Sequence, residues 1–173
     1  METTKIIEIL SYAIPSLITG GIAFLFFKQH IKNEAGKRRF AMHREAQKHA
    51  LPLRLQAYER MALFLERISP SKILLRVPPV SPNKNDYEQY IIANIEQEFE
   101  HNLTQQIYIS NECWTIITTA KNTIIQQIRN AAKGEKVTDA NTLREAILTD
   151  SMTKESPTVT ALAFIKSEVS TFL

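Results

Sequence analysis

The sequence contains little cysteine and little glycine, and these shortages limit both its fold and its chemistry. Cys113 is the single cysteine, which excludes an intrachain disulfide and a zinc site built from cysteines. Its place beside Trp114 at the start of an apolar stripe predicts a core residue rather than a nucleophile. Four glycines in 173 residues are few for a β-rich domain, which needs many turns. The composition therefore favours one small helical domain.

Common catalytic motifs are also missing. The chain contains no phosphate-binding P-loop, no Gly-x-Gly-x-x-Gly and no Gly-x-Ser-x-Gly. We therefore predict that the protein is not an enzyme, and we assign no catalytic residue, no metal ligand and no cofactor.

Charge is absent from residues 9–27, ILSYAIPSLITGGIAFLFF, which follow a short tail at residues 1–8. As a helix this run spans roughly 28 Å, close to the hydrocarbon thickness of a bilayer. A signal peptide is not favoured, because the run ends in bulky Phe26 and Phe27 instead of a small-residue cleavage site. A buried soluble helix is the other alternative, but Pro15, Gly20 and Gly21 suit a bilayer better. We predict a transmembrane helix.

Positive charge is concentrated directly after this run. Residues 28–60 carry a net charge of +6, whereas residues 61–173 carry a net charge of −2. Residues 28–50 contain no proline, so the apolar helix is expected to continue as a basic juxtamembrane stalk. The residues expected to face anionic lipid headgroups are Lys28, Lys32, Lys37, Arg38 and Arg39. The positive-inside rule then places the N-terminus outside and the following domain in the cytoplasm, at a bacterial inner membrane.

Residues 51–173 show helical periodicity without a clear strand pattern. LPLRLQAYERMALFLERISP is strongly amphipathic, with Pro52 suited to a first helical turn. A proline-rich linker at 70–83 follows, with a short connector at 73–77. Further helix starts are expected at Ser81, Ser110, Thr138 or Asp139, and Ser156, and an apolar stripe runs from Tyr87 through Leu103 to Ile107. The predicted fold is an all-α bundle of about four or five helices on a membrane-attached stalk.

Two polar clusters on the expected helices are candidate sites. Glu98 and His101 form a Glu-x-x-His pair, which is half of a di-iron motif, but no second half is present. The surface chosen as the most specific for an interaction comprises Arg54, Arg60, Glu98, Glu100, His101 and Gln105. The complementary charges of the two segments suggest an inter-helix bridge, with Arg60 and Glu100 as the pair to test.

Two blocks, LPLRLQAYERMALFLERISP and EFEHNLTQQIYIS, carry a resemblance to an uncharacterised bacterial family of short proteins. Members of that family have one N-terminal transmembrane helix and a helical cytoplasmic domain. The resemblance also covers the apolar run and the linker, but it is looser after Gly134. It implies topology and fold, and it assigns no activity and no functional residue.

The expected function is therefore protein–protein interaction, as a membrane-anchored adaptor or an accessory subunit of a membrane assembly. Three alternatives stay open at this point. The first is an enzyme or metal protein that uses His101 and nearby glutamates. The second is anionic lipid or nucleic-acid binding by the stalk, although no nucleic acid is expected because membrane retention already explains the basic charge. The third is a homo-oligomer, since Ser16 and Gly20 form a small-xxx-small pair.

Overall fold

The computed structural model describes residues 2–153 and 155–172. In this part of the chain, the side chains of residues 2–13, 16, 33, 35, 43, 46, 47 and 49 are left undescribed. Every regular element there is helical, which confirms the all-α prediction. The chain divides into two compact units, residues 1–50 and 51–173, and helix α1 (Glu2–Ile68) contributes to both.

The first unit consists of the N-terminal part of α1, and its described apolar side chains are exposed. The most exposed of those in the expected span are Leu17, Ile22, Phe24, Leu25, Phe26 and Phe27. Within the side chains that are described, no helix is long and apolar enough to cross a membrane. The side chains of residues 9–13 and 16, which belong to the expected span at 9–27, are not among those described. The transmembrane helix therefore stays a prediction.

Helix α1 passes through Pro52 without ending. The sequence suggested that a new helix begins there, but residues 48–68 are continuously helical. A proline inside a helix lacks an amide hydrogen and crowds the carbonyl four residues earlier. Buried apolar side chains of the next turns, including Ala57, Tyr58 and Met61, fix this part of α1 in the second unit. The expected boundary at residue 51 is thus a boundary between compact units within one helix.

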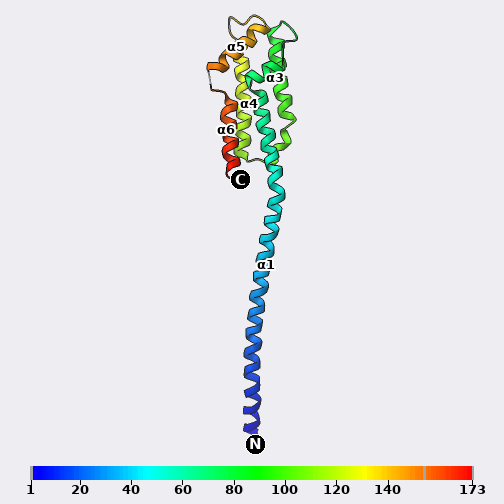
Figure 1. Ribbon diagram of the computed structural model, residues 1–173, viewed down its shortest axis with the longest axis vertical. Helices are drawn as coiled ribbons and strands as arrows, with labels where there is room; N and C mark the ends of the chain where they lie inside the picture. Colours follow the sequence, from blue (N-terminus) through cyan, green and yellow to red (C-terminus); the bar gives the residue numbers. More distant parts are fainter. Residues whose placement is uncertain (1, 154, 173) are drawn as a thin grey trace. The chain divides into compact units, whose positions relative to one another are not determined.

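The second unit is a bundle of helices (Figure 1). After α1 come α2 (Pro70–Arg76), α3 (Lys84–Glu100), the short 3-10 helix η1 (Leu103–Ile107), α4 (Asn111–Ala132), α5 (Ala140–Thr153) and α6 (Pro157–Ser170). Helix α4 packs against α3, α5 and α6, and α5 also contacts α2 and α3. The sequence predicted an extended or single-turn connector at residues 73–77, whereas residues 73–76 form the end of α2, which begins at Pro70, and Val77 is its C-cap.

The helix starts follow local capping chemistry. The Ser110 side chain accepts a hydrogen bond from the Cys113 amide at 3.0 Å, as expected from the sequence. The Asp139 carboxylate accepts from the amides of Asn141 and Thr142, and Pro157 opens α6. At α3 the cap is Asn83 rather than Ser81. Its side chain accepts from the Asn85 amide at 2.8 Å, so α3 begins at Lys84.

The core is formed by one apolar face from each helix. Its largest fully buried side chains include Phe64, Leu65, Tyr87, Ile95, Ile117, Ile124 and Ile128. Side-chain hydrogen bonds attach the segments that connect the helices to this core. The Tyr87 hydroxyl donates to the Val77 carbonyl at 2.9 Å, which fixes the proline-rich linker. The Lys84 ammonium donates to the carbonyls of Ala132 and Val137, and it thereby satisfies the end of α4.

Candidate functional site

A groove lies between the second-unit part of α1 and helix α3, and we call it the α1–α3 groove. It has a volume of about 350 Å³ and is lined by Gln56, Glu59, Arg60, Leu63, Phe64, Glu98 and Asn102. Beneath it the Phe64 and Phe99 rings pack with centroids 5.6 Å apart, so the two helices are fixed against each other. The ribbon of Figure 1 shows α3 running alongside this part of α1. The groove is thus a preformed feature of rigid elements.

Two arginines converge on one carboxylate of the groove. Arg67 Nε lies 2.8 Å from Glu98 Oε1, and Arg76 Nη1 lies 3.7 Å from Glu98 Oε2. The Arg67 contact is a close ion pair that lacks the alignment of a hydrogen bond. Arg76 also donates to the Arg67 carbonyl at 3.5 Å. The cluster therefore joins α1, α2 and α3 and keeps one surplus positive charge.

This cluster corrects the expected bridge between the two helices. The sequence suggested Arg60 with Glu100, but among the described residues neither side chain forms an ion pair. The bridge runs through Arg67 and Glu98 instead. Arg60 and Arg67 lie on the same face, seven residues apart, so charge periodicity alone did not distinguish them. Arg60 lines the groove without an ion-pair partner among the described side chains.

One exposed apolar side chain, Leu63, lines the groove, and other exposed apolar side chains occur on α1 and η1. Leu53 and Leu63 of α1 are 51% and 57% exposed, although core leucines such as Leu65 are fully buried. Leu103 and Ile107 of η1 are also exposed. The sequence assigned these two to the core stripe of α3, but α3 ends at Glu100 and η1 turns them outward. Leu63 lies off the core stripe of α1, and that mismatch was the available sequence signal for this surface.

The six residues of the predicted surface do not form one site. Arg60 and Glu98 line the α1–α3 groove. Glu100 and His101 are exposed at the end of α3, and Gln105 lies in η1, where its amide donates to Thr104. Arg54 faces another way, because its guanidinium lies 4.6 Å from the Phe172 ring centre and donates to the Tyr108 carbonyl. Gln56, Glu59 and Asn102, which belong to the two polar clusters seen in the sequence but not to the chosen surface, also line the groove, and Leu63 was missed.

The metal alternative receives no support from the geometry. Glu98, half of the Glu-x-x-His pair, is engaged by Arg67 and Arg76. His101 is exposed at the C-terminal cap of α3. In the part of the chain that the structure describes, no three histidine, cysteine or acidic side chains gather as a metal site would require. The pair is accounted for as helix-surface chemistry.

A second polar cluster is buried where α1, α4 and α6 meet. Tyr58, Cys113 and Glu168 contribute one side chain each, and Tyr58 and Cys113 are buried. Burial raises the pKa of the Cys113 thiol to about 12, and the nearby Glu168 carboxylate adds to the rise. The pKa of Tyr58 is also raised, first by burial and then by Glu168. Because a high pKa suppresses the thiolate, Cys113 is an inert core residue here.

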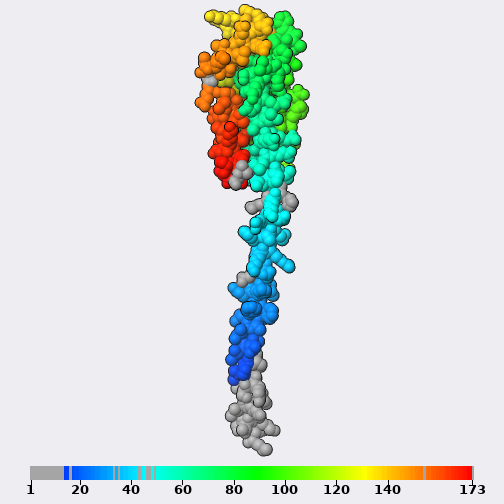
Figure 2. All heavy atoms as spheres, in the orientation of Figure 1, coloured from blue at the N-terminus to red at the C-terminus, as the bar shows by residue number. Residues whose placement is uncertain are grey.

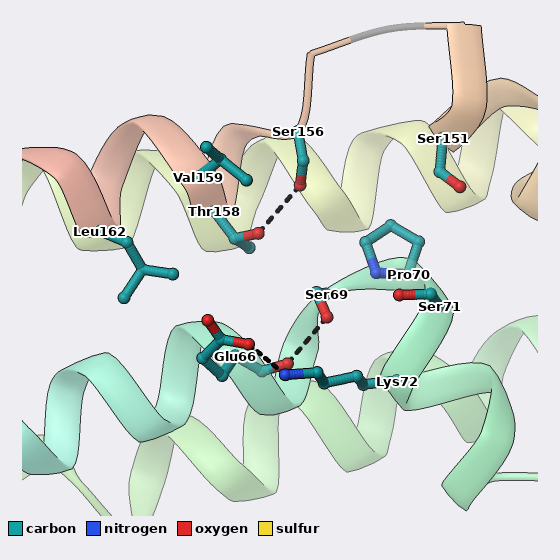
Figure 3. A pocket seen from close by; sticks show the side chains of 10 residues that line it. All are labelled: Glu66, Ser69, Pro70, Ser71, Lys72, Ser151, Ser156, Thr158, Val159 and Leu162. Carbon is teal, nitrogen blue, oxygen red and sulfur yellow. Dashed lines mark hydrogen bonds and ion pairs between the residues drawn. The ribbon is translucent and has the colours of Figure 1, made fainter.

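A smaller pocket, shown in Figure 3, lies between the α1–α2 corner and the α5–α6 connection. It measures about 240 Å³ and has five hydroxyl groups in its wall, from Ser69, Ser71, Ser151, Ser156 and Thr158. Ser69 donates to the Glu66 carbonyl at the end of α1, and Ser151 donates to the Leu148 carbonyl of its own helix. The Ser156 and Thr158 hydroxyls bond each other. Its two charged side chains, Lys72 and Glu66, form an ion pair. The pocket therefore presents no net charge and few free donors to a ligand.

The basic residues predicted for the membrane surface are all exposed on α1: Lys28, Lys32, Lys37, Arg38 and Arg39. Lys37 forms an ion pair with Glu34 at 3.2 Å, and Lys28 lies 5.9 Å from the Phe24 ring centre. Phe40 and Met42, which follow the two arginines, are exposed as well. The described stalk therefore presents cations and apolar groups together.

Comparison with known proteins identifies the family of this chain. No curated protein and no solved structure matches it significantly. One family model, described as a family of unknown function (DUF7935), matches residues 4–172, which include both units and the α1–α3 groove. The match agrees with the resemblance seen in the sequence as far as membership of an uncharacterised family is concerned. The chain belongs to the family of unknown function DUF7935.

Proposed function

We propose that this protein is a membrane-anchored adaptor whose helical domain, residues 51–173, binds another protein through the α1–α3 groove. The observation that carries the proposal is a preformed groove whose wall contains the exposed Leu63 together with Glu59 and Arg60, two charged side chains that form no ion pair among the described residues. Exposed apolar side chains around a polar-rimmed groove are typical of protein interaction sites. An adaptor or accessory subunit of a membrane assembly needs such a surface and no catalytic group.

The anchor is assigned to residues 9–27 and rests on the sequence. That run carries no charge, and the basic stalk follows it on the C-terminal side. The exposed phenylalanines at 24, 26 and 27 support the assignment, because an apolar helix surface without a protein cover suits lipid. The proposed topology has the N-terminus outside and residues 51–173 in the cytoplasm. Anionic lipid headgroups are the proposed contact of the stalk.

Affinity purification from the native membrane tests the adaptor role. A tagged full-length chain and a tagged chain that begins at Leu51 are purified in parallel in mild detergent, and the proteins bound in stoichiometric amount are identified. We expect the same partner with both chains, because the groove lies within residues 51–173. A partner that binds the full-length chain alone would place recognition in the anchor or the stalk. A repeated absence of any stoichiometric partner would contradict the adaptor role.

A pair of surface variants links the partner to the groove. Leu63→Lys places a charge at the groove, whereas Met152→Lys places one on α5, where Met152 is exposed. Both side chains are exposed, so both variants should fold. We expect Leu63→Lys to lose the partner and Met152→Lys to keep it. Equal binding by the two variants would move the interface away from the groove.

A further inference from the structure

We infer that α1 contains a hinge at residues 48–52, where the helix bends about Pro52. The inference concerns a conformational property of α1 and goes beyond the proposed function. Three observations carry it. An interior proline interrupts the helix, side-chain packing holds the helix on one side of that proline, and the chain divides into two compact units at the same place.

Pro52 interrupts the backbone hydrogen bonding of a long helix. It lies far inside α1 (Glu2–Ile68), so it is not a first-turn proline, whose amide hydrogen would have no helical partner in any case. Because proline has no amide hydrogen, the Lys48 carbonyl loses the bond that it would accept from residue 52, and the proline ring crowds the same carbonyl. Sharp bends in α-helices occur mainly at such positions. In the part of α1 that follows the apolar run, backbone hydrogen bonding is therefore weakest at residues 48–52.

Side-chain packing holds α1 on the C-terminal side of the proline. The Arg54 guanidinium donates to the Tyr108 carbonyl at 3.3 Å, and Tyr58 is buried in the core. On the N-terminal side, every described side chain of residues 36–50 is exposed. The two sides of Pro52 therefore differ in how firmly side chains restrain the helix.

A local ion pair adds little stiffness next to the proline. Lys48 Nζ lies 3.4 Å from Glu45 Oε2, three residues away on the same helix, and both side chains are exposed. Such a pair stabilises a helix only slightly in water. The boundary between the two compact units also falls here, between Ala50 and Leu51. A bend in α1 is therefore expected at residues 48–52 rather than within the packed part of the helix.

A hinge at this point leaves the α1–α3 groove intact. Gln56 is the first residue of the groove wall, and all the others follow it in the sequence, so the whole wall lies beyond Pro52. Bending about Pro52 would change the direction in which the groove faces without changing its shape. In a membrane-anchored protein, such a hinge widens the range of orientations in which the groove can meet a partner.

Distances between spin labels test the hinge in the purified full-length protein in detergent. Double electron–electron resonance measures the distribution of distances between two labels on introduced cysteines. The test pair, Arg44→Cys with Glu59→Cys, has one label on each side of Pro52. The control pair in α4, Thr115→Cys with Asn130→Cys, has the same separation in sequence, about 22 Å along a straight helix. All four of these side chains are exposed.

A third pair separates a hinge from a general flexibility of the stalk. Gln29→Cys with Arg44→Cys has the same separation again and lies entirely before Pro52. We expect a wider distance distribution for the test pair than for the α4 pair or the stalk pair. A protein without introduced cysteines should take up no label, because Cys113 is buried.

Pro52→Ala connects the bend to the proline. The substitution restores an amide hydrogen at residue 52 and replaces proline by a strong helix former, so the test-pair distribution should narrow to the width of the α4 pair. Pro52 is exposed, so the core should not be disturbed. Circular dichroism should show that the helical content is kept.

Three outcomes would overturn the hinge. An unchanged test-pair distribution in Pro52→Ala would show that the proline does not cause the bend. Equally wide distributions for the test pair and the stalk pair would assign the flexibility to the whole stalk. A narrow test-pair distribution in the wild-type protein would mean that α1 is stiff through Pro52. The measurement needs no partner, so none of these outcomes bears on the adaptor role.

Discussion

Lys121 shows how a single charged residue can be held inside this bundle. It is only 7% exposed, and its ammonium lies 2.8 and 2.6 Å from the two carboxylate oxygens of Glu96. The Lys121 ammonium also lies 4.8 Å from the centre of the Phe99 ring. The aromatic ring face and the ion pair together replace the hydration that the ammonium loses on burial. The sequence analysis did not single out Lys121, although it lies four residues after Ile117 and three before Ile124, on the apolar face of α4. The pairing depends on α3 and α4 being adjacent.

Removal of Glu96 and removal of Lys121 should lower the free energy of unfolding by unequal amounts. Glu96→Ala leaves a buried ammonium without its carboxylate, and we expect a loss of about 2 kcal/mol in the free energy of unfolding. Lys121→Met removes the charge and keeps an apolar chain of similar length, so it should cost less than about 1 kcal/mol. Urea unfolding followed by circular dichroism measures both. Equal losses would mean that the pair acts as a surface bridge.

The buried thiol predicts a dependence of stability on alkaline pH. The pKa of Cys113 is raised from 9.0 to about 12 in the folded chain. The folded state therefore keeps its proton while the unfolded state loses it as the pH rises above about 9, and stability falls through this window. Between pH 8 and pH 10 we expect Cys113 to account for a loss of about 1.4 kcal/mol. Below pH 8 it should have no effect.

Cys113→Ala supplies the matched comparison for this pH effect. The substitution destabilises the core at every pH because it removes a buried side chain. It should nevertheless reduce the further loss between pH 8 and pH 10, which urea unfolding at the two values measures. Parallel losses in the wild-type and variant proteins would refute the assigned titration. Tyr58 also has a raised pKa, but it titrates in both chains and leaves the comparison unaffected.

At the scale of elements, capping residues were better predictors than apolar stripes. Ser110 and Ser156 with Pro157 marked real helix starts because capping depends on local backbone chemistry. The stripe from Tyr87 to Ile107 failed beyond Phe99, since the chain turns at residues 101–102 and enters η1. The apolar residues continue to recur every four positions through this turn, so the sequence pattern does not show where the helix ends. The sequence analysis named charged residues of the groove, such as Arg60 and Glu98, but it did not use the position of Leu63 off the core stripe, which indicated an exposed leucine.

The two N-cap serines offer a test of capping at this scale. The Ser110 side chain accepts from the amide of Cys113, whereas the Ser156 side chain makes no capping bond and contacts the Thr158 hydroxyl. We expect Ser110→Ala to lower the free energy of unfolding by about 1 kcal/mol. Ser156→Ala should lower it less. The opposite order in urea unfolding would show that the start of α6 depends on Ser156 more than the capping geometry indicates.

At the scale of the whole molecule, the chain consists of two units with different surfaces. Residues 1–50 carry exposed apolar and basic side chains, whereas residues 51–173 enclose a core. Composition predicted this division, because charge and apolar runs are properties of the sequence itself. The identity of a partner was not predictable, because the sequence of this chain does not describe the partner surface that its own surface would match.

The division predicts that the second unit is stable by itself. A chain that begins at Leu51 retains the whole buried core, because every buried apolar residue of the described core lies at or after Ala57. We expect its thermal unfolding midpoint to match that of the full-length chain in the same detergent. A midpoint lower by several degrees would indicate that residues 1–50 contribute to the fold of the second unit. Circular dichroism gives the comparison directly.

Phe172 has a consequence for how this protein tolerates shortening. Its ring lies 5.6 Å from that of Tyr58 and under the guanidinium of Arg54, so residues near the end of the sequence are joined to helix α1 (Figure 2). A premature stop after Ser167 would remove Glu168 and Phe172 and leave Tyr58 and Arg54 exposed. Proteases would then have access to the contact between α1 and α6. Removal of the last turn of α6 together with Phe172 should therefore make this protein sensitive to proteolysis.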